Sequence, residues 1–482
     1  MTYALAGLEP KALWKHFEAL SNIPRASKKE TAACEYVLAQ AARLGLEATQ
    51  DAVGNIIVRK PARPGREGAP VAALQGHLDM VCEKNEDTIH NFDTDPIRLV
   101  RNGDWLKADG TTLGSDNGVG VAAALAVMES EDIAHGPLEF VFTIDEETGL
   151  TGASEFQDGV LKSKYFLNLD GEETGTVCIG CAGGLNTVAR RKVTRREAGS
   201  GTAWRVKVTG LKGGHSGVDI HQGRGNAIRI LGRVLQGVMD RLPIEIAELK
   251  GGSKRNVIPR EASAIVVLEA GREKELKSLI AGYEAEIKVE LGAFDPELQI
   301  TVDSTERPAT VIETAEAAQV VGLLASLHHG VLAMSPDVPG LVQTSTNLAT
   351  IATNDGQVEI SMSQRSAIEA SKLAAARMVA TVCGLAGFEV EHSGGYPGWK
   401  PEPNSELVQK VQAVHKEVFG EETKLVAIHA GLECGVIGEK HPGMQMVAFG
   451  PAILDAHSPN ERVQISSVET FWKYLKSLLE RL

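Results

Sequence analysis

The chain has 482 residues, of which 43% are hydrophobic and 23% charged, a composition typical of an ordinary globular protein and not of a disordered one. At roughly 150 residues per domain, this length predicts two to four domains. The 49 Lys and Arg and the 63 Asp and Glu give a formal net charge of −14. An acidic surface repels phosphates and anionic lipids, so we expect neither nucleic acid nor membrane as a partner, and favour small molecules or cations.

The N-terminus and the cysteines predict a cytoplasmic protein. The first residues, MTYALAGLEPKALWKHFEAL, lack the basic and then apolar layout of a signal peptide. The longest apolar stretch, at 118–128, is shorter than the roughly 18 residues that a membrane span needs. The six cysteines are scattered, and the lone pair Cys178 and Cys181 has neither the context of a redox site nor the second pair of a zinc site.

The first part of the chain alternates between predicted helices and apolar strands. A helix at 9–20 is followed by one that begins after Ser27 and Glu30, whose spacing is typical of a capping box. We predict buried strands and one buried helix in the segments 54–60, 71–81, 118–130 (the helix), 138–147 and 165–170. Such alternation indicates an α/β fold with a mostly parallel sheet between two layers of helices, whose chemistry gathers beyond the carboxyl ends of the strands.

The pattern changes in the middle of the chain and changes back before its end. Segments such as TVARRKV and TAWRVKVTG alternate in polarity, as half-exposed antiparallel strands do. Both borders are glycine-rich, CAGG and SGGYPG, as expected for hinges. We therefore predict an α+β domain inserted into the α/β domain, with these boundaries: 1–183 and 395–482 for the α/β domain, 184–394 for the insert.

Acidic and histidine residues interrupt the most apolar stretches of the α/β part, where charged groups are rarely buried unless they are paired or bind a metal. They occur in GHLDMV, GSDNGVG, DEETG, NLDGEE and DAHSPNE, and are His77, Asp79, Asp116, Glu146, Glu147, Asp170 and His457. Histidine with two or three carboxylates suits zinc, or less selectively manganese or cobalt. Five such signals in order, each at the end of an apolar strand, together predict a metal site.

In order and context these segments resemble the metal sites of the M20 family of co-catalytic zinc peptidases. KGGHSGVDIHQGRGNA, KRNVIP and HAGLECG are most similar to the aminoacyl-histidine dipeptidase branch of that family, also called Xaa-His or cytosol non-specific dipeptidases. The resemblance covers essentially the whole chain. It implies a three-layer αβα zinc-peptidase domain with an inserted lid and dimerisation domain, and a homodimer.

The resemblance also implies a set of metal ligands. Two zinc ions would bind to each chain, with manganese or cobalt as alternatives. His77 and Asp170 would hold one ion, Glu147 and His457 the other, and Asp116 would bridge the two.

Further roles follow from the same resemblance. Asp79 would orient the His77 imidazole, Glu146 would be the general base, and the peptide bond between Asp116 and Asn117 would be cis. In the insert, His215 would donate to the oxyanion, in related enzymes to that of the other subunit. Asn256 and Arg365 would hold the terminal carboxylate of the substrate, for which an Arg fork is well shaped. Three more residues lie in family-like segments without a role that we can assign: His221, His429 and Glu433.

The implied function is hydrolysis of unblocked dipeptides, including carnosine-like Xaa-His dipeptides, by a water that two zinc ions activate and Glu146 deprotonates. An aminotripeptidase, a carboxypeptidase and an N-acyl amino-acid deacylase on the same fold remain alternatives. A binding protein that has lost catalysis is disfavoured because Glu146 and every matched ligand are present. A purely structural zinc site is disfavoured because such sites are usually rich in cysteine. A serine hydrolase is disfavoured because GGHSG continues with Val218 where a nucleophile elbow needs glycine.

Overall fold

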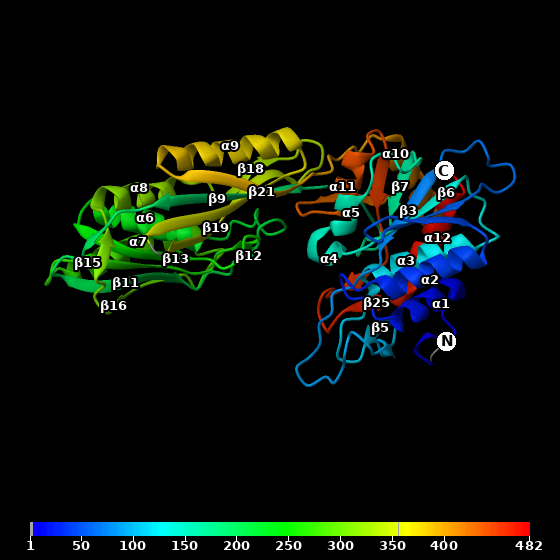
Figure 1. The fold of residues 1–482 in the computed structure, drawn as a ribbon, viewed down its shortest axis with the longest axis horizontal. Helices are drawn as coiled ribbons and strands as arrows, with labels where there is room; N and C mark the ends of the chain where they lie inside the picture. Colours follow the sequence, from blue (N-terminus) through cyan, green and yellow to red (C-terminus); the bar gives the residue numbers. More distant parts are fainter. Residues whose placement is uncertain (1–2, 355) are drawn as a thin grey trace. The chain divides into compact units, whose positions relative to one another are not determined.

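The computed structural model describes residues 3–354 and 356–482. The chain divides into two compact units, each with its own sheet (Figure 1). The first, called the α/β unit, consists of Met1–Gly180, Trp399–Ala427 and Leu432–Leu482, and the second, called the inserted unit, of Cys181–Gly398 and Ile428–Gly431. The borders lie a few residues from those expected from the sequence. The short second segment of the inserted unit was not anticipated.

The α/β unit is built on an eight-stranded sheet in the order β1-β2-β6-β3-β7-β23-β8-β22. In that order the strands are Glu47–Gln50, Ile56–Lys60, Leu138–Thr143, Ala72–His77, Tyr165–Asn168, Gln445–Ala448, Thr176–Cys181 and Lys424–Ile428. The central strands β6, β3, β7 and β23 are parallel to one another, whereas β1 pairs antiparallel with β2, β2 with β6, and β8 with β23. The centre of the sheet is therefore parallel, and antiparallel pairings lie on both sides of it. A hairpin such as β1–β2, joined by five residues, is too short for the crossover that parallel strands require.

Helices cover this sheet (Figure 1). They are α1 (Lys11–Ser21), α2 (Thr31–Arg43), α3 (Ser115–Glu129), α4 (Glu146–Gly149), α5 (Thr151–Glu155), α10 (Glu406–Phe419), α11 (Glu433–Lys440) and α12 (Ile465–Leu479). Helix α3 is buried from Ser115 to Met128, which explains why its sequence is apolar on every side. It packs against α1 and β3, and so fixes the start of the helix beside the end of that strand. A small four-stranded sheet completes the unit, in the order β24 (Ile453–Leu454), β25 (Arg462–Gln464), β5 (Trp105–Ala108) and β4 (Leu99–Asn102).

The capping box predicted for the second helix is wrong. Helix α2 begins at Thr31, and no side chain caps it. The Ser27 hydroxyl instead donates to Asp79 Oδ2 at 2.8 Å, and Glu30 accepts the N–H of Lys28. Asp79 is a fully buried carboxylate. Such a group needs hydrogen-bond donors more than the exposed start of a helix does, because an unsatisfied buried acceptor is costly.

The inserted unit has a nine-stranded antiparallel sheet, ordered β16-β11-β15-β13-β19-β20-β9-β21 with β18 paired to β19. In that order the strands are Gln299–Ser304, Thr202–Thr209, Ala262–Leu268, Ile244–Gly251, Val342–Asn354, Gln357–Ser366, Gly183–Lys192, Glu389–Tyr396 and, for β18, Gly330–Met334. Its helices are α6 (Ala227–Met239), α7 (Glu273–Leu291), α8 (Thr314–Ser326) and α9 (Glu369–Leu385). Two short strand pairs complete it, β10 (Arg195–Glu197) with β17 (Thr310–Ile312) and β12 (Gly214–His215) with β14 (Val257–Ile258). This is the α+β architecture that the alternating segments predicted.

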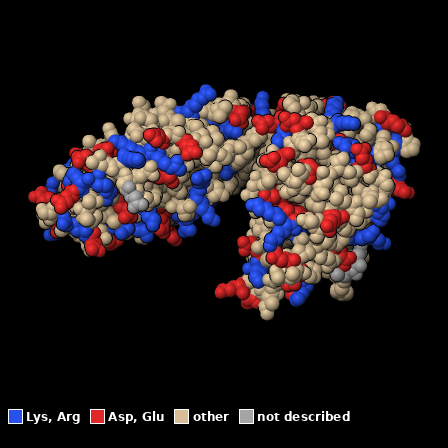
Figure 2. Space-filling view, in the orientation of Figure 1, with Lys and Arg blue, Asp and Glu red and all other residues tan. Residues whose placement is uncertain are grey.

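The described surface carries both signs of charge. In the view of Figure 2, Lys and Arg are interspersed with Asp and Glu over each unit, without one large field of either sign. Among the helices of the described residues, none is long and apolar enough to cross a membrane.

Two helical glycines provide a test of the packing of α3. A Cβ at Gly120 would lie 2.4 Å from the backbone oxygen of Leu169, whereas a Cβ at Gly282 in α7 would meet nothing within 4 Å. Alanine favours a helix by about 1 kcal/mol over glycine, but overpacking against backbone costs about 1–3 kcal/mol. We expect Gly120→Ala to lower the free energy of unfolding and Gly282→Ala to raise it slightly, as measured by urea denaturation. Equal stability of the two variants would contradict the close packing.

Candidate metal centre

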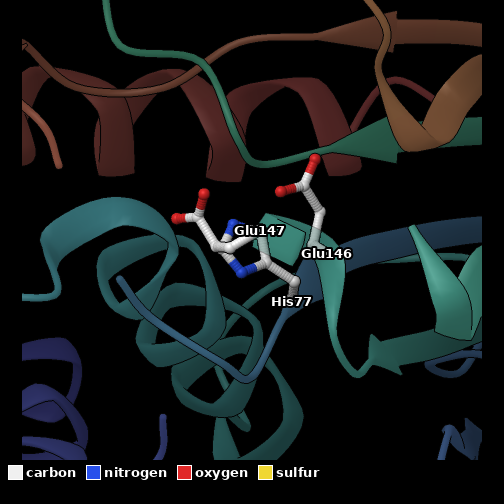
Figure 3. A group of neighbouring side chains, drawn as sticks. All are labelled: His77, Glu146 and Glu147. Atoms are coloured by element: carbon white, nitrogen blue, oxygen red, sulfur yellow. The ribbon is translucent and has the colours of Figure 1, made fainter. Parts of the chain in front are cut away.

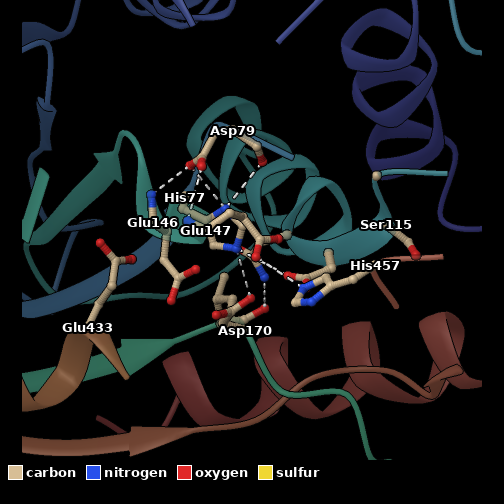
Figure 4. A network of polar contacts seen from close by, with 12 residues as sticks. His77, Asp79, Ser115, Glu146, Glu147, Asp170, Glu433 and His457 are labelled. Atoms are coloured by element: carbon tan, nitrogen blue, oxygen red, sulfur yellow. Dashed lines mark hydrogen bonds and ion pairs between the residues drawn. The ribbon is translucent and has the colours of Figure 1, made fainter. Parts of the chain in front are cut away.

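The ligand candidates of the α/β unit gather where its central parallel strands end (Figure 4). His77 is the last residue of β3, Glu146 and Glu147 open α4 after β6, and Asp170 follows β7. Since the carboxyl ends of neighbouring parallel strands meet at one edge of the sheet, the fold itself brings these side chains together. Two loops complete the group with Asp116, at the start of α3, and His457, after β24.

His77, Asp116 and Asp170 form one cluster of potential ligands. His77 Nε2 lies 3.1 Å from Asp116 Oδ1 and 3.5 Å from Asp170 Oδ1. The imidazole is 1% exposed. Its pKa is raised well above the usual value, because the neighbouring carboxylates outweigh the opposing effect of burial.

Asp116, Glu147 and His457 form a second cluster. His457 Nε2 lies 3.0 Å from Asp116 Oδ2 and 3.1 Å from Glu147 Oε2. Hydrogen bonds to these two carboxylates raise the pKa of His457 to about 11, although the side chain is half exposed. Glu147 Oε1 is buried and has no hydrogen-bond partner among the described residues.

Asp116 belongs to both clusters, with one carboxylate oxygen toward each histidine. Burial opposes its ionisation, but the hydrogen bonds from His457 and His77 hold the pKa of Asp116 well below its usual range. The peptide bond between Asp116 and Asn117 is cis, as predicted. A carboxylate shared in this way is the geometry that a pair of closely spaced cations requires.

The donor set fits divalent cations. Protons on two imidazoles occupy positions between carboxylates where the positive charge of a metal would lie, and metal binding displaces such protons. The ionised forms of Glu146 and Asp170 are destabilised by their surroundings. Burial raises the pKa of Glu146 to about 8 and, together with nearby Asp116, raises that of Asp170 well above its usual value. A bound cation would offset this cost, and the Glu147 oxygen that has no hydrogen-bond partner would coordinate it.

Asp79 connects the two sides of the centre. Its backbone oxygen hydrogen bonds to His77 Nδ1 at 3.2 Å, and its carboxylate lies 3.4 Å from the same nitrogen. The carboxylate also accepts the backbone N–H groups of Glu146 and Glu147 at 3.1 and 3.2 Å. These contacts hold the imidazole with Nε2 toward Asp116, and they fix the start of α4. Asp79 is therefore placed to orient His77 without itself facing the two clusters.

The adjacent acids Glu146 and Glu147 point in different directions, as expected from their spacing (Figure 3). Glu147 faces His457 and belongs to the second cluster. The Glu146 side chain also lies within reach of His77. It is an electrostatic neighbour of Glu433, whose carboxylate is 1% exposed and accepts from Gln75 and Thr143.

The loops that carry these ligands contain unusual backbone conformations. Asp145 and Leu150, on either side of α4, have φ values of 49° and 54°, and His457 itself has 62°. Such left-handed conformations of residues other than glycine cost about 1–3 kcal/mol each and are concentrated at functional sites. Hydrogen bonds from the Thr148 and Thr151 hydroxyls to the Asp145 carboxylate stabilise the loop around α4.

A further group of buried acids, Glu30, Asp79 and Asp145, also lies close enough to hold an ion. These carboxylates already accept hydrogen bonds from backbone N–H groups or hydroxyls, and no imidazole belongs to the group. We therefore regard it as the support of the α4 loop and not as a metal position.

The predicted oxyanion donor and the two predicted substrate-binding residues lie near one another in the inserted unit. In the β12–β14 pair, His215 stands opposite Val257, beside Asn256 in the preceding turn. Arg365 in β20 is buried, donates to the Tyr396 hydroxyl at 2.8 Å and is an electrostatic neighbour of His215. The structure thus groups these residues within their own unit, as it groups the metal ligands within the other.

The hydrogen bonds of His215 define its tautomer. Nδ1 accepts the backbone N–H groups of Gly217 and Val218 at 3.2 and 3.3 Å, so the proton of the neutral ring is on Nε2. Burial and the charge of Arg365 lower the pKa of His215, which keeps the ring neutral. The residue can therefore donate one hydrogen bond through Nε2.

Several residues around these groups were not predicted from the sequence. Glu461 and Arg25 are buried beside the ligand loops; Glu461 lies in a segment already singled out, whereas nothing in the sequence around Arg25 indicates its place. His429, whose role was open, hydrogen bonds to Ser345 within the inserted unit at 2.7 Å. It belongs to the segment 428–431, so its surroundings could not be inferred from its position in the chain.

Comparison with known proteins identifies the class. Residues 73–481 match Peptidase family M20/M25/M40, and the chain belongs to this family of peptidases. It is 39% identical to the cytosol non-specific dipeptidase of Escherichia coli (strain K12), over 99% of both chains. It is also similar to the crystal structure of aminoacylhistidine dipeptidase from Vibrio alginolyticus, with 41% identity, a TM-score of 0.94 and coverage of 99% of this chain and 98% of that one. The aminopeptidase PepT of Bacillus cereus shares the fold, at 16% identity and a TM-score of 0.56 with 98% of both chains covered.

The shared carboxylate generates a prediction for stability. Mn²⁺, Co²⁺ or Zn²⁺ added to metal-free protein should raise the melting temperature, because each site stabilises the folded state by about 2.7 kcal/mol at a hundredfold excess over its dissociation constant. Asp116→Asn should remove most of this rise, since both clusters lose a ligand. Calorimetry with and without metal measures both effects. An unchanged rise in the variant would show that Asp116 is not shared.

Proposed function

We propose that the protein is a cytoplasmic, homodimeric metallo-dipeptidase that hydrolyses unblocked dipeptides, including Xaa-His dipeptides. One observation carries this proposal: two ligand clusters share Asp116 beside Glu146, in a chain that matches a dipeptidase over its whole length. The name of the Escherichia coli relative supports both the substrate class and the compartment.

The two clusters would hold two divalent cations, zinc by preference and manganese or cobalt as alternatives. His77 and Asp170 would bind one ion, Glu147 and His457 the other, and Asp116 both. When bound, the ions supply Lewis acidity, which polarises the substrate carbonyl and makes water a nucleophile at neutral pH.

Glu146 would act as the general base. It lies beside His77 at the edge of the centre, and its side chain leaves the backbone in a different direction from that of Glu147 (Figure 3). Burial raises the pKa of Glu146 to about 8, and cations bound beside it would bring this pKa down toward neutrality, the range in which a group both accepts and returns a proton efficiently. Glu146 would take a proton from the attacking water and deliver it to the leaving amine.

The inserted unit would supply the remaining contacts to the substrate. His215 would donate Nε2–H to the oxyanion, since its Nδ1 is occupied by backbone N–H groups. Arg365 is buried, and its Nε has no hydrogen-bond partner among the described residues, which leaves a donor for the terminal carboxylate of a dipeptide. Asn256, exposed in the turn beside His215, would bind the same carboxylate.

The substrate class is tested with metal-loaded protein whose metal content has been measured. We expect chelator-sensitive hydrolysis of β-Ala-His, Gly-His and Ala-Ala, and little hydrolysis of a tripeptide or an N-acetyl amino acid. Cleavage of only the acetylated compound would identify a deacylase, and cleavage mainly of the tripeptide an aminotripeptidase. No turnover by fully metallated protein would favour a binding protein without catalytic activity.

The role of Glu146 is tested by Glu146→Gln. This variant keeps the shape of the side chain but removes the base, so kcat should fall by at least about 10²–10⁴-fold while the metal content stays the same. Glu155→Gln, at an exposed position in the neighbouring helix α5, is the matched control and should leave kcat unchanged. Full activity of Glu146→Gln would remove Glu146 from the mechanism.

A further inference from the structure

The Glu461 carboxylate is enclosed by the loop that leads to Asp116. It is 2% exposed and lies four residues after His457, just before β25. Oε2 accepts the backbone N–H groups of Leu113 and Gly114 at 2.7 and 3.0 Å. Oε1 accepts the N–H groups of Ser115 and Asp116 at 2.7 and 3.3 Å and the Ser115 hydroxyl at 2.6 Å.

In all five contacts the carboxylate accepts the hydrogen bond. A side chain at position 461 that itself donates hydrogen bonds would therefore not fit. Consecutive N–H groups before a helix attract an anion, and here the anion is an internal side chain. Because the N–H of Asp116 is one of the donors, Glu461 fixes the backbone from which the shared carboxylate projects. Figure 4 places Ser115 on the His457 side of the network.

Arg25 connects the same loop to the end of β3. It is 3% exposed, and Nη1 donates to the backbone oxygens of Leu78 and Asp79 at 2.9 and 3.0 Å, while Nη2 donates to that of Gly114 at 2.5 Å. A Cβ at Gly114 or Gly118 would lie 2.5 or 2.7 Å from Nη2, so glycine is required at both positions for the guanidinium to fit.

Arg25 and Glu461 thus join three segments that carry ligand candidates: the turn after His77, the loop before Asp116 and the loop after His457. Arg25 is also an electrostatic neighbour of Glu461, which partly balances its buried charge. These contacts lie behind the ligands and touch none of the carboxylate oxygens that face the two clusters.

We propose that Glu461 and Arg25 are positioning residues that hold the Asp116 carboxylate between the two metal positions. This inference rests on the proposed metal centre. Without the Glu461 carboxylate, the backbone N–H groups of residues 113–116 lose the acceptor that they share, and this backbone is no longer held in place. The Asp116 carboxylate would then be less well positioned for both ions. Loss of an outer partner of a metal ligand typically weakens metal binding about 10–100-fold.

The test is Glu461→Gln in full-length protein, with Co²⁺ as the probe. The amide has the size of the carboxylate but turns an NH₂ group toward backbone N–H donors. We expect both Co²⁺ ions to bind about 10–100-fold more weakly in competition with a chelator, and the visible spectrum of bound Co²⁺ to change. The spectrum reports ligand geometry, which a loss of stability alone does not alter.

Glu139→Gln is the matched control. Glu139 is also 2% exposed and accepts a backbone N–H from Lys162 and a hydroxyl from Ser163, but these partners belong to no ligand loop. Its Co²⁺ affinity and spectrum should match those of the wild type, even where its stability falls. If Glu461→Gln behaves like this control, Glu461 is only structural and the proposal is wrong.

Two milder variants keep the test decisive if Glu461→Gln does not fold. Ser115→Ala removes one donor to Glu461 and should weaken Co²⁺ binding several-fold, and Arg25→Lys should act in the same direction because one ammonium cannot reach the carbonyls on both sides. Unchanged Co²⁺ binding in both would overturn the proposal. If the wild-type protein itself binds no Co²⁺, the proposed metal centre is wrong. If the wild type binds two Co²⁺ ions and the variants bind them equally well, the metal centre stands and only the present inference is wrong.

Discussion

The α/β unit places a charged carboxylate, that of Asp116, between two imidazoles in its interior. Charge in an apolar interior is costly unless it is paired and hydrogen bonded. Here each oxygen of Asp116 faces one histidine, and the backbone beside it is held by Glu461. Much of the surrounding architecture serves this arrangement, including the buried helix α3 and the parallel centre of the sheet, which brings the strand ends together.

The acids around Asp116 show why the centre is suited to bind cations: the basic side chains of the site do not balance all of their negative charge. Glu146 and Asp170 are both held toward their neutral forms by burial, while both histidines are held toward their charged forms. The protein has therefore assembled more negative charge than its own side chains can balance. Divalent ions would resolve this imbalance. The left-handed backbone at His457 is a conformation that costs energy and is concentrated at functional sites.

The ligand candidates could be predicted from the sequence because each follows an apolar strand or opens a buried helix. His77, Glu147 and Asp170 stand out for that reason, and the family resemblance supplied the pairing between them. Arg25 could not be found in this way, since it is a lone arginine whose acceptors lie 53 to 89 residues further along the chain. The role of Ser27 was misjudged for a related reason: its local pattern fits a helix cap, but a distant buried carboxylate, Asp79, competes for the hydroxyl.

For the sheet of the α/β unit and for the inserted unit, the sequence predicted some features and not others. Apolar runs identified the central strands, but alternation alone did not reveal that β1, β2 and β8 are antiparallel, which depends on short connections. In the inserted unit, the position of His215 in a two-residue strand could not be seen, because a pair such as β12–β14 has too few residues for a periodic pattern. Its tautomer depends on backbone N–H groups that only the folded loop supplies.

The most direct test of the account is anomalous diffraction from crystals grown with Zn²⁺ or Mn²⁺. Two peaks are expected in each chain, one among His77, Asp116 and Asp170 and the other among Asp116, Glu147 and His457. A single peak, or a peak among Glu30, Asp79 and Asp145, would contradict the central role of the shared carboxylate.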